Sequence, residues 1–205
     1  MKTAMTVTYE VGEGLYINVT NYCTNHCFFC IRKNGEGAYG SDSLWLEREP
    51  TEEEILDSVF SRDLSKYKEL VFCGYGEPSV RLGVCRSVAL KVKAVAPHLS
   101  VRINTNGHSD LILERNTAPE YRDAFDTVSI SLNAPTAEKY AEICHPVYKL
   151  SALDAVIEFA RNVKEYVHST VFTVVGDFLT EKEISECRSI ADSVGIPLRV
   201  REYIG

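Results

Sequence analysis

Short β-rich runs alternate with stretches of helical periodicity along almost the whole chain. The runs predicted as strands are 15–20, 70–73, 101–105, 128–132, 171–175 and 198–203, and apolar residues recur at helical spacing over 51–60, 84–95, 153–167 and 181–194. This alternation indicates parallel strands joined by crossover helices. Six strands are too few for a closed eight-stranded barrel of about 250 residues. The sequence therefore predicts an α/β fold, an open, partial TIM-like barrel of about six parallel strands.

Three local patterns add detail to this fold. Residues 6–10, followed by Gly12-Glu13-Gly14, predict a hairpin with the first strand. Thr180, with Glu183 three residues later, predicts a capping box at the start of the last helix. The irregular stretch 33–50 is long enough to be functional, and we expect a lid loop over a substrate rather than a plain surface excursion.

Length and composition limit the class of protein. A chain of 205 residues with 45% apolar residues is expected to form a single domain over 1–205. The net charge of −7 argues against nonspecific binding of nucleic acid. We see no signal peptide and no run of about 18 apolar residues, so we expect a cytoplasmic protein that does not enter a membrane. Seven cysteines in that compartment would not form a disulfide framework, which makes a metal or redox role the first explanation for clustered cysteines.

Three of the cysteines are clustered directly after the first predicted strand. They form Cys23-Thr-Asn-His-Cys27-Phe-Phe-Cys30, a CxxxCxxC pattern, where the carboxyl end of a barrel strand places catalytic loops. Three thiolates so close together repel one another unless a metal centre shares their charge. Zinc is the rival, with His26 or a distant residue as fourth ligand. However, structural zinc sites usually use two separated pairs of ligands, and His26 adjoins Cys27.

Two further polar or glycine-rich segments follow predicted strands. The first is Gly74-Tyr-Gly-Glu-Pro78, whose glycines allow a close approach to a ligand and whose Glu77 can accept hydrogen bonds from an ammonium group. The second is a set of polar residues at the ends of the next two strands. Strand alternation places Asn104 and Asn106 on one face of the third strand, and Ser129, Ser131 and Asn133 on one face of the fourth. Turn chemistry alone is the alternative explanation for these small polar residues.

Together these motifs resemble the radical S-adenosylmethionine (SAM) superfamily, whose signature CxxxCxΦC has an aromatic residue at Φ, here Phe29. The resemblance implies that Cys23, Cys27 and Cys30 bind three irons of a 4Fe-4S cluster, and that SAM binds the fourth. It implies reductive cleavage of SAM to a 5′-deoxyadenosyl radical that abstracts hydrogen from an unidentified substrate. The SAM contacts it implies are Phe29, Gly74, Tyr75, Gly76, Glu77, Asn104, Ser131 and Asn133.

At a finer level, the segments 16–21 and 74–78 and the compact length resemble the TatD-linked radical SAM proteins, which implies an association with a TatD-type nuclease. An external electron donor, flavodoxin or ferredoxin, is also expected. Glycyl-radical activating enzymes are a similar small alternative. The 7-carboxy-7-deazaguanine synthases fit less well, because Ile31-Arg32-Lys33 stands where they place a Thr or Ser. A non-catalytic iron–sulfur scaffold or sensor for a nuclease partner is a further alternative, against which the intact Glu77 argues.

Four residues are candidates for catalysis or for binding the substrate. Cys144 and His145 lie in the connection after the fourth predicted strand, where a thiol could return a hydrogen atom and an imidazole could donate a proton, although both could also be ordinary loop residues. Arg201 and Tyr203 share one face of the last strand and, with the 33–50 loop, are expected to form a substrate pocket. The planar guanidinium of Arg201 suits a carboxylate or phosphate, and a solvated edge strand is the alternative.

Overall fold

The structure is a computed structural model that describes residues 4–35 and 37–203. Its strands form one sheet in the order β1 to β7, in which β1 is antiparallel to β2 and all later pairs are parallel. The predicted hairpin and the six parallel strands are confirmed. The strands are β1 (Thr8–Val11), β2 (Gly14–Ile17), β3 (Glu69–Phe72), β4 (Ser100–Thr105), β5 (Thr127–Ser131), β6 (Ser169–Val175) and β7 (Leu198–Arg201).

Helices occupy the crossovers between the strands. The four predicted helices are present, and two short ones, α3 and α4, were not predicted. No helix in the described ranges is long and apolar enough to cross a membrane. The helices are α1 (Glu52–Phe60), α2 (Leu82–Val95), α3 (Ser109–Leu113), α4 (Ala137–Cys144), α5 (Ala152–Val163) and α6 (Glu181–Val194), with 3-10 turns η1 (Ile31–Lys33), η2 (Leu64–Lys66), η3 (Pro78–Arg81), η4 (Ala118–Tyr121), η5 (Lys149–Ser151) and η6 (Gly176–Phe178).

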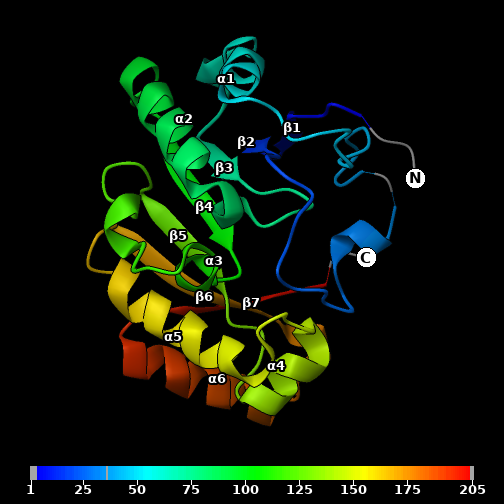
Figure 1. Ribbon diagram of the computed structural model, residues 1–205, viewed down its shortest axis with the longest axis vertical. Coiled ribbons are helices and arrows are strands. Elements are labelled where there is room, and N and C mark those ends of the chain that lie inside the picture. Colours follow the sequence, from blue (N-terminus) through cyan, green and yellow to red (C-terminus); the bar gives the residue numbers. More distant parts are fainter. Residues whose placement is uncertain (1–3, 36, 204–205) are drawn as a thin grey trace.

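The order of the strands explains the shape of the molecule. Because neighbouring strands in the sheet are also consecutive in the sequence, every crossover of the same hand places its helix on the same face. Figure 1 shows α1, α2, α5 and α6 around the outside of the curved sheet and the segment 21–50 on its other side. Since β1 and β7 are the two edges, the barrel is open, as predicted.

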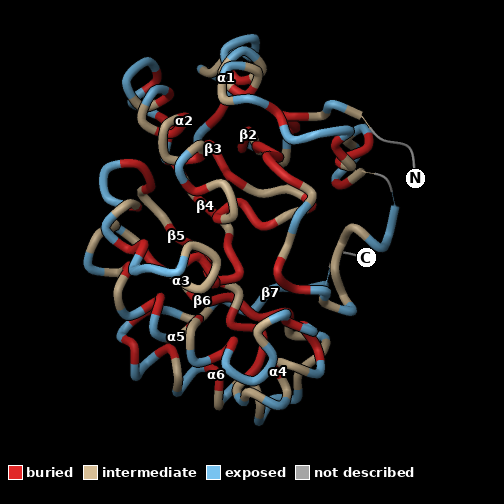
Figure 2. Tube along the Cα trace, viewed as in Figure 1, coloured by how far each residue is buried: buried red, intermediate tan, exposed pale blue. Residues whose placement is uncertain are grey.

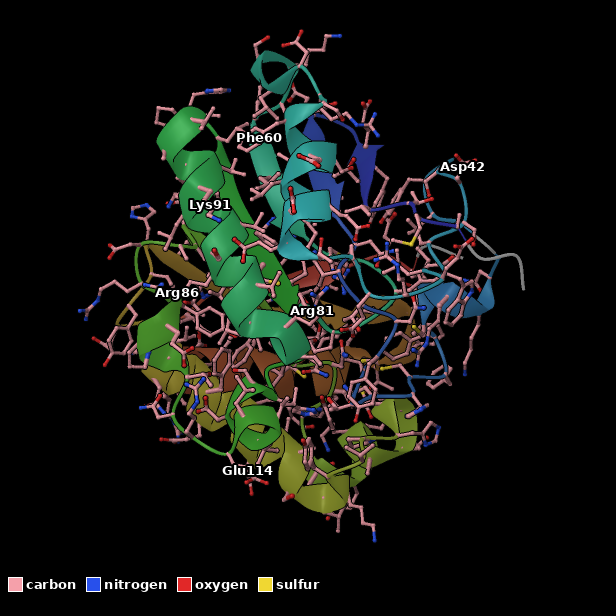
Figure 3. The ribbon with its side chains drawn as sticks, turned by 45° about the horizontal axis from the view of Figure 1, so that its top comes forward. Asp42, Phe60, Arg81, Arg86, Lys91 and Glu114 are labelled. Atoms are coloured by element: carbon pink, nitrogen blue, oxygen red, sulfur yellow. The ribbon has the colours of Figure 1, made fainter. Side chains whose placement is uncertain are left out.

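The two faces of the sheet differ in chemistry. The face toward the helices is apolar, and the buried positions follow the strands in Figure 2. Polar contacts join α2, on which Figure 3 labels Lys91 and Arg86, to its neighbours: Lys91 pairs with Glu52 of α1 at 2.6 Å, and Arg86 donates to the Glu120 carbonyl of η4 at 3.0 Å. The opposite face, toward the barrel lumen, carries polar side chains such as Tyr16 and Arg102, which hydrogen-bond to each other.

The long loop 33–50 is packed against the barrel. The buried Tyr75 donates its hydroxyl to the carbonyls of Gly35 and Gly37, at 3.2 Å each, and its ring meets Trp45 edge-on at 5.1 Å. Leu44 is buried in the same small cluster. The loop, of which Glu36 lies outside the described residues, is therefore a packed wall beside the lumen and not a free surface excursion.

The predicted capping box of α6 is present and has a measurable consequence. Glu183 N donates to Thr180 Oγ1 at 3.2 Å, and Thr180 N donates to the Glu183 carboxylate at 2.7 Å. Thr180→Ala removes the cap and is expected to lower the free energy of unfolding by about 1 kcal/mol, measured by urea denaturation. Ser185→Ala, at an exposed position of the same helix, is the matched control. Equal stability of the two variants would contradict the role of the cap.

Candidate functional site

The loop that carries the three cysteines is held against the end of α4. His26 N donates to the Cys144 carbonyl at 2.9 Å, Phe28 N to the Ile143 carbonyl at 3.1 Å, and Val147 N to the Thr24 carbonyl at 2.9 Å. Cys23, Cys27 and Cys30 are free and half-buried. Backbone hydrogen bonds in both directions therefore fix the cysteine loop against the end of α4. The three thiols all belong to this one short segment.

The thiols of this loop are protonated near neutral pH. Burial raises the pKa of Cys23 to about 12 and also raises that of Cys30. The pKa of Cys27 is raised first by its hydrogen bond with the Cys144 thiol and then by burial. A metal centre that binds these cysteines must displace their protons, and the nearby Arg32 favours the thiolate form of all three.

The arrangement suits a multinuclear centre. Among the described residues, no three His, Cys, Asp or Glu side chains form a group that could hold one metal ion. A single zinc needs its ligands around one point, whereas each cysteine of an iron–sulfur cluster takes a different iron. The CxxxCxxC spacing also differs from the two separated pairs of ligands that are usual in structural zinc sites.

A buried hydrogen-bond network supports the cysteine loop from behind. Asn106 Nδ2 donates to Thr24 Oγ1 at 2.8 Å, and Thr24 shares a hydrogen bond with His108 Nδ1 at 3.0 Å. His108 Nε2 lies 3.3 Å from the Tyr140 hydroxyl, which also accepts from Asn25 Nδ2 at 3.0 Å. Burial lowers the pKa of His108 to about 4, so its ring is neutral. His108 and Tyr140 belong to no recognisable motif, so the sequence alone does not predict their place in this network.

Glu77 connects the cysteine loop to the ends of β3 and β4. Its buried carboxylate accepts hydrogen bonds from Thr105 Oγ1 at 2.7 Å, Asn106 N at 2.7 Å and Ser79 N at 3.0 Å. Its own N–H donates to the Tyr22 carbonyl at 2.7 Å, one residue before Cys23. Burial raises the pKa of Glu77, and these hydrogen bonds oppose that rise. Glu77 is therefore a structural hub of the site.

The glycines around Glu77 are required by packing. A Cβ on Gly74 would overlap the side chain of Asn18, and a Cβ on Gly76 would overlap the carbonyls of Thr20 and Tyr22. The glycine pattern of the sequence predicts the close approach of a ligand. The structure shows that they also let this turn lie directly against the segment that leads into the cysteine loop.

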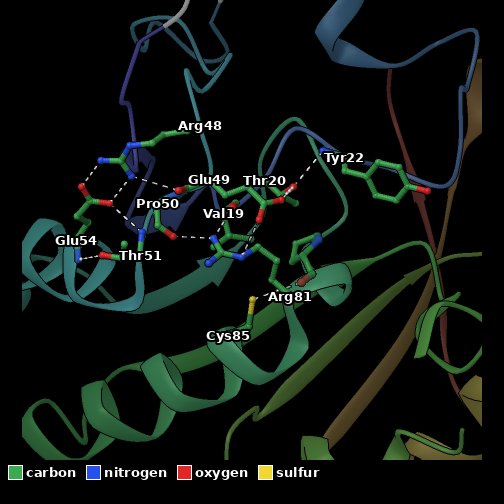
Figure 4. A network of polar contacts seen from close by, with 11 residues as sticks. Val19, Thr20, Tyr22, Arg48, Glu49, Pro50, Thr51, Glu54, Arg81 and Cys85 are labelled. Carbon is green, nitrogen blue, oxygen red and sulfur yellow. Dashed lines mark hydrogen bonds and ion pairs between the residues drawn. The ribbon is translucent and has the colours of Figure 1, made fainter. Parts of the chain in front are cut away.

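Arg81 fastens the same segment to the end of the long loop. It donates to the carbonyls of Val19 and Pro50, at 2.8 Å each, and pairs with Glu49 at 3.4 Å (Figure 4). Glu49 in turn accepts from Thr20 Oγ1 at 2.6 Å. The lead-in to the cysteine loop, the long loop and η3 are thus held by one guanidinium.

Asn133 and Phe29 are placed close to the cysteines. Asn133 has a left-handed backbone with φ 57°, donates to the Cys144 sulfur at 3.5 Å, and leaves its buried Oδ1 without a partner among the described residues. An unpaired buried acceptor costs about 1 to 3 kcal/mol, so it fits a donor on a bound ligand. Phe29 stacks on Phe178 with ring centroids 5.2 Å apart.

The other predicted residues have these positions. Asn104 accepts from Arg102 at 3.1 Å, and Ser131 is half-buried at the end of β5. Tyr75 is buried under the long loop, and its hydroxyl is hydrogen-bonded to the Gly35 carbonyl. His145 caps α4 with φ 44° and an exposed side chain.

The remaining two candidates lie at the far edge of the sheet. Arg201 ends β7, and the Tyr203 hydroxyl accepts from Asn34 Nδ2 at 2.8 Å, beside η1. The Tyr203 ring also contacts Phe178 at 5.1 Å, which joins it to the aromatic cluster around Phe29. The residues that follow β7 therefore contact the segment that follows the cysteines, and the expected substrate pocket of Arg201 and Tyr203 stays a prediction.

The hub role of Glu77 predicts a loss of stability on a nearly isosteric change. Glu77→Gln places an amide NH₂ among donors from Thr105, Asn106 and Ser79, so at least one buried donor loses its acceptor. The free energy of unfolding is expected to fall by about 1 to 3 kcal/mol in urea denaturation. Glu138→Gln on α4 is the exposed control. A Glu77→Gln protein as stable as this control would show that the hydrogen bonds do not hold the site together.

Comparisons with known proteins agree with this geometry. The family model of the radical SAM superfamily matches residues 17–189. The probable GTP 3′,8-cyclase of Methanocaldococcus jannaschii is 27% identical over 200 residues, which cover 94% of this chain and 59% of that protein. The chain therefore spans about three fifths of the length of that relative.

Solved structures share the fold at low sequence identity. A radical SAM methyltransferase from Sphaerobacter thermophilus has a TM-score of 0.67 at 15% identity, covering 97% of this chain and 69% of that one. Streptococcus suis SuiB bound to S-adenosylmethionine has a TM-score of 0.59 at 17% identity, covering 92% and 38%. With the family model matching most of its length, the chain belongs to the radical SAM superfamily, whose enzymes use a 4Fe-4S cluster and SAM and need an external reductant.

Proposed function

We propose that this chain cleaves SAM reductively at a 4Fe-4S cluster held by Cys23, Cys27 and Cys30, and that it removes a hydrogen atom from a substrate in the barrel lumen. The observation that carries the proposal is the single loop with three half-buried free cysteines, tied by the Glu77 N–H to the Gly74–Glu77 turn. When bound, the cluster supplies the electron that splits SAM into methionine and a 5′-deoxyadenosyl radical.

The chain's own residues position SAM and keep water out. The turn 74–77 offers backbone groups next to the cysteine loop, and the unpaired Oδ1 of Asn133 offers an acceptor for a donor on SAM. Asn104 and Ser131 supply further polar groups at the ends of β4 and β5, and Phe29 supplies an apolar surface. Glu77 acts on SAM mainly through the turn that it orients, because its carboxylate already accepts three hydrogen bonds from the chain.

The partners are part of the same proposal. A flavodoxin or ferredoxin supplies the electron, and the segments 16–21 and 74–78 support membership of the TatD-linked group, with a TatD-type nuclease as functional associate. Cyclisation of GTP is a second candidate reaction, favoured by the 27% identity to the probable cyclase. GTP is therefore one substrate to add to the assay below.

The cluster is tested by metal content. Anaerobically purified protein is expected to hold about four irons and four sulfides per chain, with the brown colour of a cubane cluster. Cys27→Ala should lose the cluster, whereas Cys187→Ala, at a buried cysteine of α6, should retain it. Stoichiometric zinc without iron in the anaerobic preparation would refute the proposal.

The contribution of Asn133 is tested by SAM binding and cleavage. Wild-type enzyme with dithionite should release 5′-deoxyadenosine and methionine in equal amounts, and an intact cluster without any cleavage would favour the scaffold alternative. Asn133→Ala should keep the cluster and weaken SAM binding by roughly threefold to tenfold in calorimetry, because one hydrogen bond is lost. Asn162→Ala on the outside of α5 is the control. SAM affinity equal to that of the control would assign Asn133 another role.

A further inference from the structure

The register of the parallel strands decides which side chains face the lumen. Partners in register lie on the same face of a sheet, and side chains alternate between faces along each strand. Leu70, Phe72, Ile103 and Ile130 belong to the core under the helices. The alternate positions therefore line the lumen, and along the sheet they include Glu69, Val71, Cys73, Arg102, Asn104, Ser129, Ser131, Thr173, Val175, Arg199 and Arg201.

This inner face is basic in a chain that is acidic overall. Its charged side chains on β3 to β7 are the guanidinium groups of Arg102, Arg199 and Arg201 and the single carboxylate of Glu69. Glu69 pairs with Arg102 at 2.7 Å. Arg199 and Arg201 form no ion pair within residues 4–35 and 37–203. Two uncompensated positive charges therefore remain at the β7 side of the lumen.

Arg201 is exposed but has charged and titratable neighbours on several elements. Its side chain is accessible to solvent, yet burial lowers its pKa, and the nearby positive charges of Arg199 and Arg102 lower it further. Cys73, which follows β3, and Tyr39 of the long loop have the opposite electrostatic effect and raise the pKa of Arg201. The register of β7 with β6 places Arg201 beside Val175 on the inner face, and its electrostatic neighbours come from β4, β7, the end of β3 and the long loop.

Like charges so close together lower the stability of the protein when no ligand is bound. Each guanidinium makes the charged form of the others less favourable, and a partly buried cation without a partner loses hydration. A bound anion removes both costs. The planar guanidinium also binds carboxylate and phosphate groups through two parallel hydrogen bonds.

We propose that the lumen binds an anionic group of the substrate, a phosphate or a carboxylate, through Arg201 with the help of Arg199. This inference rests on the proposed function, in which the lumen receives the substrate. Arg201 lies at the carboxyl end of its strand, the edge at which the cysteine loop and the ends of β3 to β5 also gather. An anion held there places the rest of the substrate toward the SAM site.

The test uses anaerobic holoenzyme and two probes, tripolyphosphate and citrate, titrated by calorimetry with and without saturating SAM. Wild type is expected to bind at least one probe in the presence of SAM, and the tighter probe identifies phosphate or carboxylate as the preferred group. Arg201→Gln should weaken that binding at least about 10-fold, the loss of one charge-assisted hydrogen-bonded contact. Arg199→Gln should weaken it less, and Arg188→Gln, exposed on α6, should behave as wild type.

Three results would overturn the anion site: no binding of either probe to wild type, equal binding by Arg201→Gln, or displacement of the probe by SAM, which would give the guanidinium to the SAM carboxylate. Iron content and the absorption spectrum show that each variant is folded and loaded, and Arg199→Gln decides the case if Arg201→Gln fails this check. Release of 5′-deoxyadenosine by wild type is measured separately. Its absence beside intact probe binding would reject the proposed radical chemistry and leave the anion site supported.

Discussion

The buried carboxylate of Glu77 is the point at which the site is assembled. Its oxygens accept from the end of β4 and from the first turn of η3, while its own N–H reaches the residue before Cys23. A carboxylate without these partners would be costly to bury, so the three segments and the charge stabilise one another. The cysteine loop has no regular secondary structure of its own before η1, and its position depends on this contact and on the turn after α4.

The sequential order of the strands has a second consequence for chemistry. Since α1, α2, α5 and α6 lie on one face, the other face is left to the segment 21–50, whose long loop 33–50 packs beside it. The carboxyl ends of all six parallel strands therefore meet at one rim. Asn34 and Tyr203, which are 169 positions apart in the chain, become neighbours there, although nearly the whole barrel separates them in the sequence.

The motifs with a strict spacing were predictable, and the contacts that support them were not. Alternating β and helical patterns revealed the sheet, and the CxxxCxxC pattern revealed the cluster ligands, because both depend on local periodicity or spacing. His108 and Tyr140 were missed because their partners, Thr24 and Asn25, are more than 80 residues away. The glycines of 74–76 were recognised, but their packing against residues 18–22 depends on the parallel pairing of β2 with β3, which a single sequence does not specify.

The positive charge of the lumen could not be predicted either, because it depends on how the last strand pairs with its neighbour. In the sequence, Arg199 and Arg201 are two basic residues on a terminal strand, equally suited to an exposed edge. Only the register with β6 directs them inward, and only the curvature brings Arg201 within electrostatic reach of Arg102. A stable fold would gain from an acid beside these groups, as Arg102 gains from Glu69. Sites that bind ligands commonly sacrifice stability in this way, and the missing partner is then supplied by the ligand.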